Sequence, residues 1–334
     1  MADMTGSPPR RAALRIFLER VAVVAACLLF AAPAFAQSYP TRQIRLVVPF
    51  AAGGPADLLG RVIADEISKD LGQQVFVDNR PGANTILGAE TVAKANPDGY
   101  TLLMAIDGTL VMNPFLYSTL SYDPFKDFAP ISLIARVPSV IEAGLNVPVN
   151  TVKELIDLAK AKPGGLLMGY STPTSQVSVE LLGKMAGVKF TLVPYRGGMT
   201  LVTALLGGEI QVGHESLNVS LPFARAGKLK IIALTSAARV SIAPEIPTIA
   251  ETLPGFDLGI WQSIVAPANT PREIIDKLHH EITAVLSRDA VRDKLTTAGV
   301  EPATSQSPEE FAEFIRAQAE IRRKVIQSVG IKLD

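Results

Sequence analysis

The chain has 334 residues, 48% of them hydrophobic, which is enough to bury the core of one large or two ordinary domains. Its 32 basic and 32 acidic residues balance, and only 6% of the residues are aromatic. This composition argues against a nucleic-acid-binding protein, which needs a basic surplus or a base-stacking surface, and against a disordered charged tail.

The first 36 residues have the three-part pattern of a secretory signal peptide. Three arginines make the start positive, a 12-residue apolar run follows at residues 21–32, and Ala34 and Ala36 occupy the small-residue positions of a cleavage site. A membrane anchor is the alternative, but a span needs about 20 apolar residues. We therefore expect cleavage after Ala36 and a mature protein in the periplasm.

Cys27, the only cysteine, raises a second alternative, because VAAC at residues 24–27 resembles a lipoprotein signal. Cleavage there would leave strongly apolar sequence directly behind the lipid. Cleavage after Ala36 removes 36 of 334 residues and leaves 298, with 28 basic and 30 acidic residues and no cysteine. The mature protein then has no thiol nucleophile, disulfide or cysteine metal site, and no later segment apolar enough to cross a membrane.

In the first part of the mature chain, short apolar runs alternate with amphipathic stretches. The pattern predicts a strand at 44–48, a helix at 56–71, a strand at 75–79, a helix at 86–95 and a strand at 100–105. Gly72 ends the first helix, and residues 80–82 form a turn. Such alternation is typical of a parallel sheet with helices on its faces.

The alternation of apolar and amphipathic segments resumes after a proline-rich connection at residues 113–130. Here the predicted strands are 131–144, 166–170, 190–195, 209–213, 229–235 and 256–267. The predicted helices are 152–161, one that follows STPTSQ (171–176) and ends at Met185, 200–206, one near Leu221, 272–286, 289–297 and 308–329. Thr151 is a suitable N-cap for the helix that follows it. The sequence thus predicts a second α/β unit and three closing helices.

Two α/β units joined by two extended segments predict a chain that crosses between two lobes twice, near residues 137–141 and 257–263. We expect one lobe at residues 37–138 plus 262–334 and the other at 139–261. In open parallel sheets, ligands sit beyond the carboxyl ends of the strands. The strand-to-helix turns should therefore line a ligand site.

Three such turns have suitable chemistry. IRLVVPFAAGGPAD, residues 44–57, breaks a strand into a glycine-containing loop before a helix, where free N–H groups and the helix dipole suit a carboxylate without any arginine. An ordinary tight turn is the alternative. STPTSQ, residues 171–176, offers hydroxyls that could bind a ligand or cap a helix. In PYRGG, residues 194–198, Arg196 could pair with a carboxylate or be solvated.

Enzyme motifs are missing from the sequence, which contains no G-x-S-x-G, P-loop, H-E-x-x-H or G-x-G-x-x-G. His279 and His280 are neighbours on a predicted helix, point about 100° apart, and are expected to be solvated. His214, in GHES at residues 213–216, should follow a strand at the site, but no third group completes a catalytic set with it. We expect no enzyme activity, no metal and no cofactor.

At the level of whole segments, the chain resembles the Bug-type extracytoplasmic solute receptors of tripartite tricarboxylate transporters. The resemblance covers essentially the mature chain and rests on VPFAAGGPADLLGR (48–61), VDNRPGAN (77–84), PDGYTLLM (97–104), VPYRGG (193–198), LLGGEIQV (205–212), AGKLKIIALTS (226–236), PTIAETLPGF (247–256) and APANTP (266–271). Each segment alone is weakly specific, and their number and order make the match specific.

The resemblance implies an α/β type II periplasmic-binding-protein fold, with two hinged lobes and a central ligand cleft. It also implies a small carboxylate held by main-chain amides and waters, and delivery to the permease subunits in the membrane. From the two α/β units and their two extended connections we expect a monomer. First-lobe contacts would be Phe50, Ala51, Ala52, Gly53, Gly54, Asp57, Asn84, Asp107, Gly108 and Thr109, the last three in a turn at 106–109. Second-lobe contacts would be Ser171, Thr172, Thr174, Ser175, Tyr195, Arg196, Gly197, Glu215 and Ser216.

The sequence departs from the family pattern where the ligand is expected. Relatives usually have threonine at position 56, a glycine-rich loop and a histidine in place of STPTSQVS, phenylalanine at His214 and aspartate at Glu215. A buried carboxylate without a cationic partner costs several kcal/mol. Glu215 could therefore face an ammonium group on the ligand, or pair with Arg196 and leave a plain di- or tricarboxylate as the ligand, which we favour.

Two other functions remain open at this point. A sensor that reports its ligand to a membrane histidine kinase needs the same closing cleft, and the sequence does not separate it from a transport receptor. A periplasmic enzyme would need a nucleophile, a base and an orienting group, and would turn its ligand over.

Overall fold

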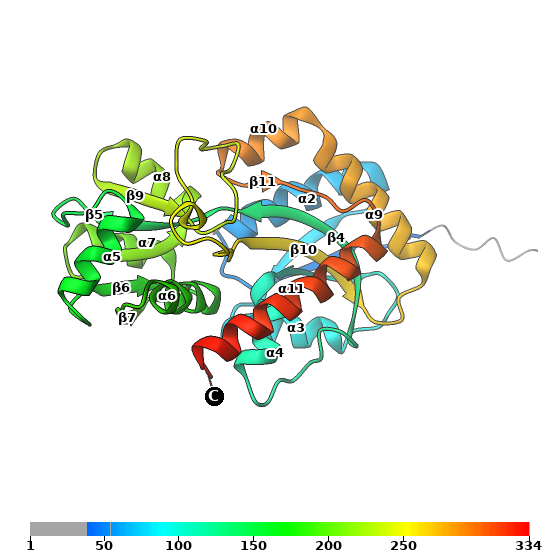
Figure 1. The fold of residues 1–334 in the computed structure, drawn as a ribbon. Helices are drawn as coiled ribbons and strands as arrows, with labels where there is room; N and C mark the ends of the chain where they lie inside the picture. Colours follow the sequence, from blue (N-terminus) through cyan, green and yellow to red (C-terminus); the bar gives the residue numbers. More distant parts are fainter. Residues whose placement is uncertain (1–38, 54, 334) are drawn as a thin grey trace, which may run out of the picture. The chain divides into compact units, whose positions relative to one another are not determined.

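A computed structural model describes residues 39–53 and 55–333 of the chain (Figure 1). The predicted signal peptide, with Cys27 and its cleavage site, and Gly54 of the first loop lie outside the described residues. From Arg42 onward the chain forms one compact unit that contains two β-sheets. In this part of the chain, no helix combines the length and apolar character needed to cross a bilayer.

The first sheet has six strands in the order β11-β4-β10-β3-β1-β2. Their bounds are β1 (Ile44–Val48), β2 (Val75–Asn79), β3 (Thr101–Ile106), β4 (Phe128–Val137), β10 (Ile260–Pro267) and β11 (Glu301–Pro302). Strands β1, β2 and β3 are parallel, whereas β10 is antiparallel to both β3 and β4. The parallel arrangement predicted for the first three strands is therefore confirmed. The antiparallel pairing arises because β10 enters this sheet from the other sheet and not through a helical crossover.

The second sheet has five strands in the order β7-β6-β8-β5-β9 and is drawn in green at the left of Figure 1. They are β5 (Ser139–Gly144), β6 (Leu167–Tyr170), β7 (Thr191–Pro194), β8 (Val212–Ser216) and β9 (Leu229–Leu234). Strand β6 is parallel to β7 and β8, and β5 is antiparallel to β8 and β9. Strands β6, β7 and β8 therefore bring three strand-to-helix turns to one edge of this sheet.

The helices follow the predicted order. They are α2 (Pro55–Leu71), α3 (Ile86–Ala93), α4 (Asn113–Leu116), α5 (Val152–Ala161), α6 (Pro173–Ala186), α7 (Gly198–Leu206), α8 (Leu217–Arg225), α9 (Arg272–Ser287), α10 (Asp289–Thr297) and α11 (Pro308–Val329). Short helical turns are η1 (Ala83–Thr85), the π-helix η2 (Gly108–Met112) and η3 (Ile249–Glu251). Thr151 caps α5 as predicted, because its side chain accepts a hydrogen bond from the Glu154 amide.

Two local predictions differ from the structure. The turn at 106–109 is the end of β3 and the start of η2. The proline-rich connection at 113–130 also contains α4. The strand predicted at 209–213 is β8, at Val212–Ser216. The predicted strand ended at Gly213, whereas β8 continues through His214 and Glu215, which are polar yet buried and so give no apolar signal.

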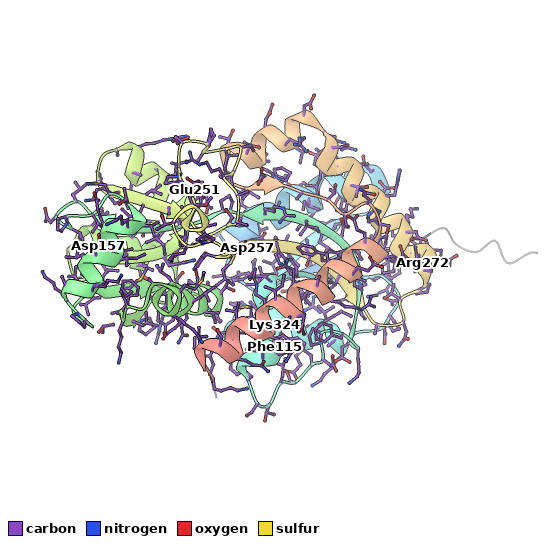
Figure 2. All side chains as sticks on the ribbon, in the orientation of Figure 1. Phe115, Asp157, Glu251, Asp257, Arg272 and Lys324 are labelled. Carbon is purple, nitrogen blue, oxygen red and sulfur yellow. The ribbon has the colours of Figure 1, made fainter. Side chains whose placement is uncertain are left out.

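The chain passes between the sheets at two places. Pro138 separates β4 of the first sheet from β5 of the second, and the segment from β9 back to β10 contains Asp257, labelled in Figure 2. Helix α11, drawn in red, packs against both cores: Phe311 and Ile315 belong to the core around Trp261, and Ile326 belongs to the core around Leu182. The two sheets are thus joined by apolar packing as well as by the chain.

Candidate functional site

The first loop, residues 50–53 between β1 and α2, is shaped by the buried carboxylate of Asp57. Asp57 Oδ2 accepts hydrogen bonds from the Gly53 amide (2.9 Å) and from Arg61 Nε (2.9 Å). Asn79 Nδ2 donates to Asp57 Oδ1 (3.0 Å) and to the Phe50 carbonyl (3.0 Å). The side chain predicted to contact a ligand therefore holds the loop in place.

Burial would raise the pKa of Asp57, but hydrogen bonds from Arg61, Gly53 and Asn79 outweigh it and hold the pKa below its usual value. The carboxylate is therefore charged at neutral pH, and Arg61 is engaged with it. Ala51 and Ala52 are exposed, and no hydrogen-bond partner is found for their amides among the described residues. These two amides are the donors that the loop offers to an anion.

Asn84 lies in η1, where Ala83, Asn84 and Thr85 all have left-handed backbones, with φ of 45°, 50° and 75°. Such a run is uncommon outside glycine. Buried Asn113 fixes it by donating to the Asn84 carbonyl (2.9 Å), and the Thr85 hydroxyl bonds that of Thr109 (2.7 Å). The exposed Asn84 amide also donates to Tyr117 Oη.

Asp107 directly follows β3 and is completely buried. Its Oδ2 accepts a hydrogen bond from the hydroxyl of Thr174 on α6 (3.2 Å), so this contact joins the two sheets. Burial raises the pKa of Asp107 to about 6, although the nearby positive charge of Arg322 lowers it. Arg322 in turn donates to the carbonyls of Asp257 (2.8 Å) and Gly259 (3.0 Å), on the return connection.

The hydroxyls of the second-lobe turn at 171–175 have partners within the protein. Thr172 and Ser175 form a capping box at the start of α6, which bears out the helix-capping alternative for these two residues. Ser171 and Thr174 point elsewhere, to Glu215 and Asp107. The turn is therefore ordered before any ligand binds.

Glu215 ends up with partners that the sequence did not indicate. Its Oε2 accepts from the Ser171 hydroxyl (2.6 Å), and its Oε1 accepts from the Ser216 amide (2.8 Å) and hydroxyl (2.7 Å). Arg196 is exposed and forms no ion pair with Glu215 in the described structure. The predicted Glu215–Arg196 pair was therefore wrong, because hydroxyl groups on neighbouring turns already solvate the carboxylate.

The remaining second-lobe contacts surround the start of α7. Tyr195 is half-buried, and its ring packs near Gly169 of β6. Gly197 is the N-cap of α7 and supplies no side chain to the free amides of the helix. Gly108 and Thr109, on the first-lobe side, are buried within η2, and a Cβ on Gly108 would lie 3.6 Å from the Thr174 hydroxyl.

The histidines do not form a reactive set. His214 lies within β8 and not after a strand, is 1% exposed, and neither ring nitrogen has a partner among the described residues. Burial lowers its pKa to about 4, so the ring is neutral at pH 7. His279 was wrongly predicted to be solvated, because its ring bonds the Ser305 carbonyl (3.1 Å). The described residues contain no cluster of three potential metal ligands.

Buried Glu142 gives a testable pH dependence. Burial and the neighbouring charge of Glu215 raise its pKa to about 7, from 4.5 in an unfolded chain. The folded protein thus keeps a proton that the unfolded chain releases. The contribution of Glu142 to the free energy of unfolding is therefore fully present below about pH 4.5. It is lost as the pH rises towards 7, and the loss is on the order of 3 kcal/mol.

We expect Glu142→Gln to flatten the fall in the free energy of unfolding between about pH 5 and 8, measured by urea denaturation. Asp107 acts in the same direction up to its pKa of about 6, and His214 acts in the opposite direction below about 6.5. The difference between wild type and variant isolates Glu142. Equal slopes for the two proteins would contradict a buried, protonated Glu142.

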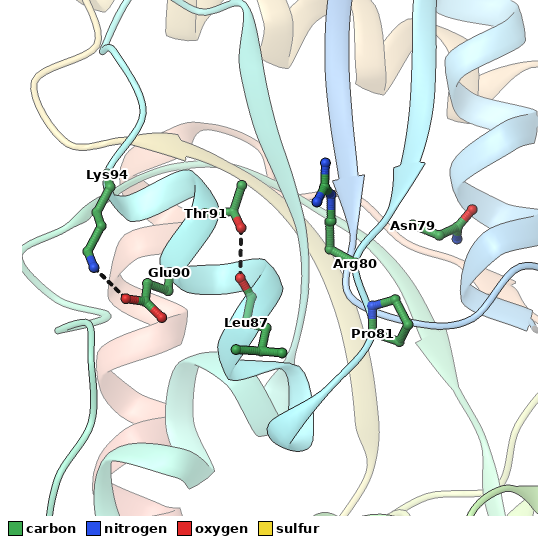
Figure 3. A pocket seen from close by; sticks show the side chains of 7 residues that line it. All are labelled: Asn79, Arg80, Pro81, Leu87, Glu90, Thr91 and Lys94. Atoms are coloured by element: carbon green, nitrogen blue, oxygen red, sulfur yellow. Dashed lines mark hydrogen bonds and ion pairs between the residues drawn. The ribbon is translucent and has the colours of Figure 1, made fainter.

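A surface cavity of about 480 Å³ lies beside α3 and is shown in Figure 3. Its lining is Asn79, Arg80, Pro81, Leu87, Glu90, Thr91 and Lys94. Arg80 pairs with Asp78, and Lys94 pairs with Glu90, so the cavity offers no unpaired charge. None of the predicted ligand contacts lines it, and we assign it no ligand.

Comparison with known proteins supports one family. The sequence profile of the "Tripartite tricarboxylate transporter family receptor" matches residues 59–331. The chain is similar to BugT of Bordetella pertussis, with 32% identity over 307 residues that cover 91% of this chain and 94% of BugT.

Solved structures agree with this match. An R. palustris protein solved with adipate has 37% identity and a TM-score of 0.82, covering 88% of this chain and 99% of its own. MatC from Rhodopseudomonas palustris with bound malate has 31% identity and a TM-score of 0.77, covering 86% and 100%. These likenesses confirm the predicted two-lobe periplasmic-binding-protein fold.

Proposed function

The chain belongs to the tripartite tricarboxylate transporter receptor family, whose members are periplasmic solute-binding proteins, and from this premise we propose that it captures a small carboxylate between its two lobes. The membrane subunits of such a transporter are its proposed partners, and the receptor acts as a monomer. Relatives of similar fold were solved with adipate and malate, which are both carboxylates.

The observation that carries this proposal is the first loop. Its exposed Ala51 and Ala52 amides have no partner in the described structure, and they lie before the N-terminus of α2. Arg61, on that helix, is held by Asp57. Backbone amides at a helix start bind an anion well without a charged side chain. A carboxylate is thus the group that fits this loop.

The proposed lobes are residues 37–138 plus 262–334, and 139–261. The proposed contacts are the loop at 50–54, Asn84 and Asp107–Thr109 from the first lobe, with the turns at 171–175, 195–197 and 215–216 from the second. Support comes from the sheet topology, because five of these segments follow β1, β2, β3, β6 and β7, and residues 215–216 form the end of β8. The Asp57 carboxylate holds the first loop by accepting a hydrogen bond from the Gly53 amide.

We propose that the protein has no enzyme activity. His214 has no nucleophile or orienting group within hydrogen-bond reach among the described residues, so no catalytic set is assembled around it. Calorimetry with a panel of di- and tricarboxylates, amino acids and aromatic acids tests binding. Recovery of unchanged ligand after long incubation tests turnover. Binding without turnover is expected, and a converted ligand would contradict the receptor function.

We expect the lobes to close on the ligand, and small-angle scattering should show a smaller radius of gyration with ligand than without. Thr174→Val keeps the side-chain shape but removes the hydroxyl that bonds Asp107 across the sheets. It should weaken ligand binding about fivefold, the effect of a net hydrogen bond of about 1 kcal/mol. An unchanged radius with a ligand shown to bind would contradict closure.

Export should remove residues 1–36. The first residue of the protein recovered from the periplasm is expected to be Gln37, by N-terminal sequencing or intact mass. A lipid on Cys27, or a mature chain that retains Arg20, would contradict this cleavage.

A further inference from the structure

The turn at the start of α6 donates all four of its hydroxyl protons inward. Ser171 donates to Glu215 (2.6 Å) and Thr174 to Asp107 (3.2 Å). Thr172 donates to Ser175 Oγ (3.1 Å), and Ser175 donates to the Thr172 carbonyl (2.8 Å). A hydroxyl has one proton and two lone pairs. Thr174 and Ser175 are buried, so only the hydroxyls of Ser171 and Thr172 reach the surface. With their protons directed inward, these two can only accept hydrogen bonds from a ligand.

Ser216 repeats this arrangement on the next strand. Its hydroxyl donates to Glu215 Oε1 at 2.7 Å, and the Ser171 bond to Oε2 has the length expected of a hydroxyl on a carboxylate. Both serines are half-buried, whereas Glu215 is 7% exposed. The carboxylate is therefore behind the serines, and the oxygens that reach the surface are theirs.

Gly198 holds the carboxylate in this place. A Cβ on Gly198 would lie 2.6 Å from Glu215 Cδ and 2.7 and 2.8 Å from its two oxygens. Helix α7 therefore begins directly against the carboxylate, which cannot move towards the helix. Glu215 thus connects the turns that follow β6, β7 and β8.

Glu215 has no cationic partner among the described residues, and its carboxylate is bound by serine groups. The positive charge near buried Asp107 is that of Arg322, which donates to backbone carbonyls and not to the site. Arg196 is exposed and unpaired with either acid in the described structure. A second carboxylate on the ligand would meet lone pairs and negative charge at this end.

We propose that Glu215 sets the specificity of the second-lobe end of the site, by taking the protons of Ser171 and Ser216 and leaving only acceptors. The end of the ligand remote from its bound carboxylate then carries hydrogen-bond donors, a hydroxyl or an ammonium group. This rests on the proposed binding of a carboxylate by the first loop. The sequence favoured a plain di- or tricarboxylate as the ligand, on the basis of a Glu215–Arg196 pair. Without that pair, a ligand with a donor at its far end is preferred.

The test uses acids that differ only at their far end. Calorimetry compares butyrate, 4-hydroxybutyrate, 4-aminobutyrate and succinate, and the matching six-carbon set of hexanoate, 6-hydroxyhexanoate, 6-aminohexanoate and adipate. Wild type should prefer the hydroxy or amino acid over the dicarboxylate of the same length by at least about tenfold. In Glu215→Gln, the side-chain amide can donate a hydrogen bond to one of the serines. The hydroxyl proton of that serine is then free to point towards the ligand. That variant should lose the preference or reverse it.

Gly198→Ala provides a second test that leaves Glu215 in the sequence. The new methyl group displaces the carboxylate, and affinity for the hydroxy or amino acid should fall about tenfold. Adding Glu215→Asp shortens the side chain and should restore part of that affinity. Gly144→Ala, whose Cβ would have no neighbour closer than 3.6 Å, is the matched control.

The outcomes distinguish a failure of the role proposed for Glu215 from a failure of carboxylate binding itself. A wild type that prefers the dicarboxylates, with the same ratio in Glu215→Gln, would overturn the role of Glu215 and leave carboxylate binding intact. Failure of all eight acids to bind the wild type would contradict the proposed function, and the inference with it. Loss of binding in Gly198→Ala without recovery in the double variant would also count against Glu215.

Discussion

Replacing Gly53 by valine is expected to lower ligand affinity at least about a hundredfold, because the first loop cannot keep its shape with a side chain there. Gly53 has φ +85°, and a β-branched residue in that region is a strained outlier. Relief of the strain would move the amide that donates to Asp57, and the Ala51 and Ala52 amides with it. Gly54 lies outside the described residues, and its place in the glycine-containing loop of the sequence predicts that Gly54→Val also abolishes binding.

Gly72→Val is the matched control for this experiment. Gly72 also has a left-handed backbone, φ +63°, and a Cβ on either glycine would have no neighbour within 4 Å. It lies at the opposite end of α2, about 25 Å from the first loop by helix length. Both variants should lose similar stability in urea, but only Gly53→Val should lose affinity in calorimetry. Normal binding by Gly53→Val would place the anion site elsewhere.

Replacing Arg322 by alanine should give the largest loss of stability, about 3–5 kcal/mol in the free energy of unfolding. Arg322 is 2% exposed, and its guanidinium holds the carbonyls of Asp257 and Gly259, which would lose their donors. It also supplies the positive charge nearest to buried Asp107. Urea denaturation of the wild type and the variant measures the effect.

The neighbouring Arg323 serves as the control. It lies on the same helix and pairs with Glu320 on the surface, with a side chain 40% exposed. Exposed ion pairs contribute little, so Arg323→Ala should leave the free energy of unfolding almost unchanged. Comparable losses in the two variants would show that Arg322 acts through general helix content and not through the return connection.

Local signals in the sequence predicted much of the fold. Gly72 marks the end of α2, Thr151 caps α5, and regular apolar spacing located α9, α10 and α11 to within one residue. The first loop was also recognisable, because its glycines directly follow a buried strand and precede a helix. These features depend on residues close together in the chain.

The partners of the site residues could not be predicted, because they are distant in sequence. Ser171 and Glu215 are 44 residues apart, and Asp107 and Thr174 are 67 apart. Asn79 reaches Asp57 because β1 and β2 pair in parallel, a register that the sequence alone does not specify. The i, i+4 spacing of Asp57 and Arg61 was a signal that could have revealed their ion pair.

The central claim is that this receptor binds a small carboxylate, and mass spectrometry of the molecule released on denaturing the natively purified protein tests it most directly. We expect a single small carboxylic acid at close to one equivalent, and none from Gly53→Val purified in parallel. A released molecule without a carboxylate, or equal amounts from both proteins, would contradict the claim.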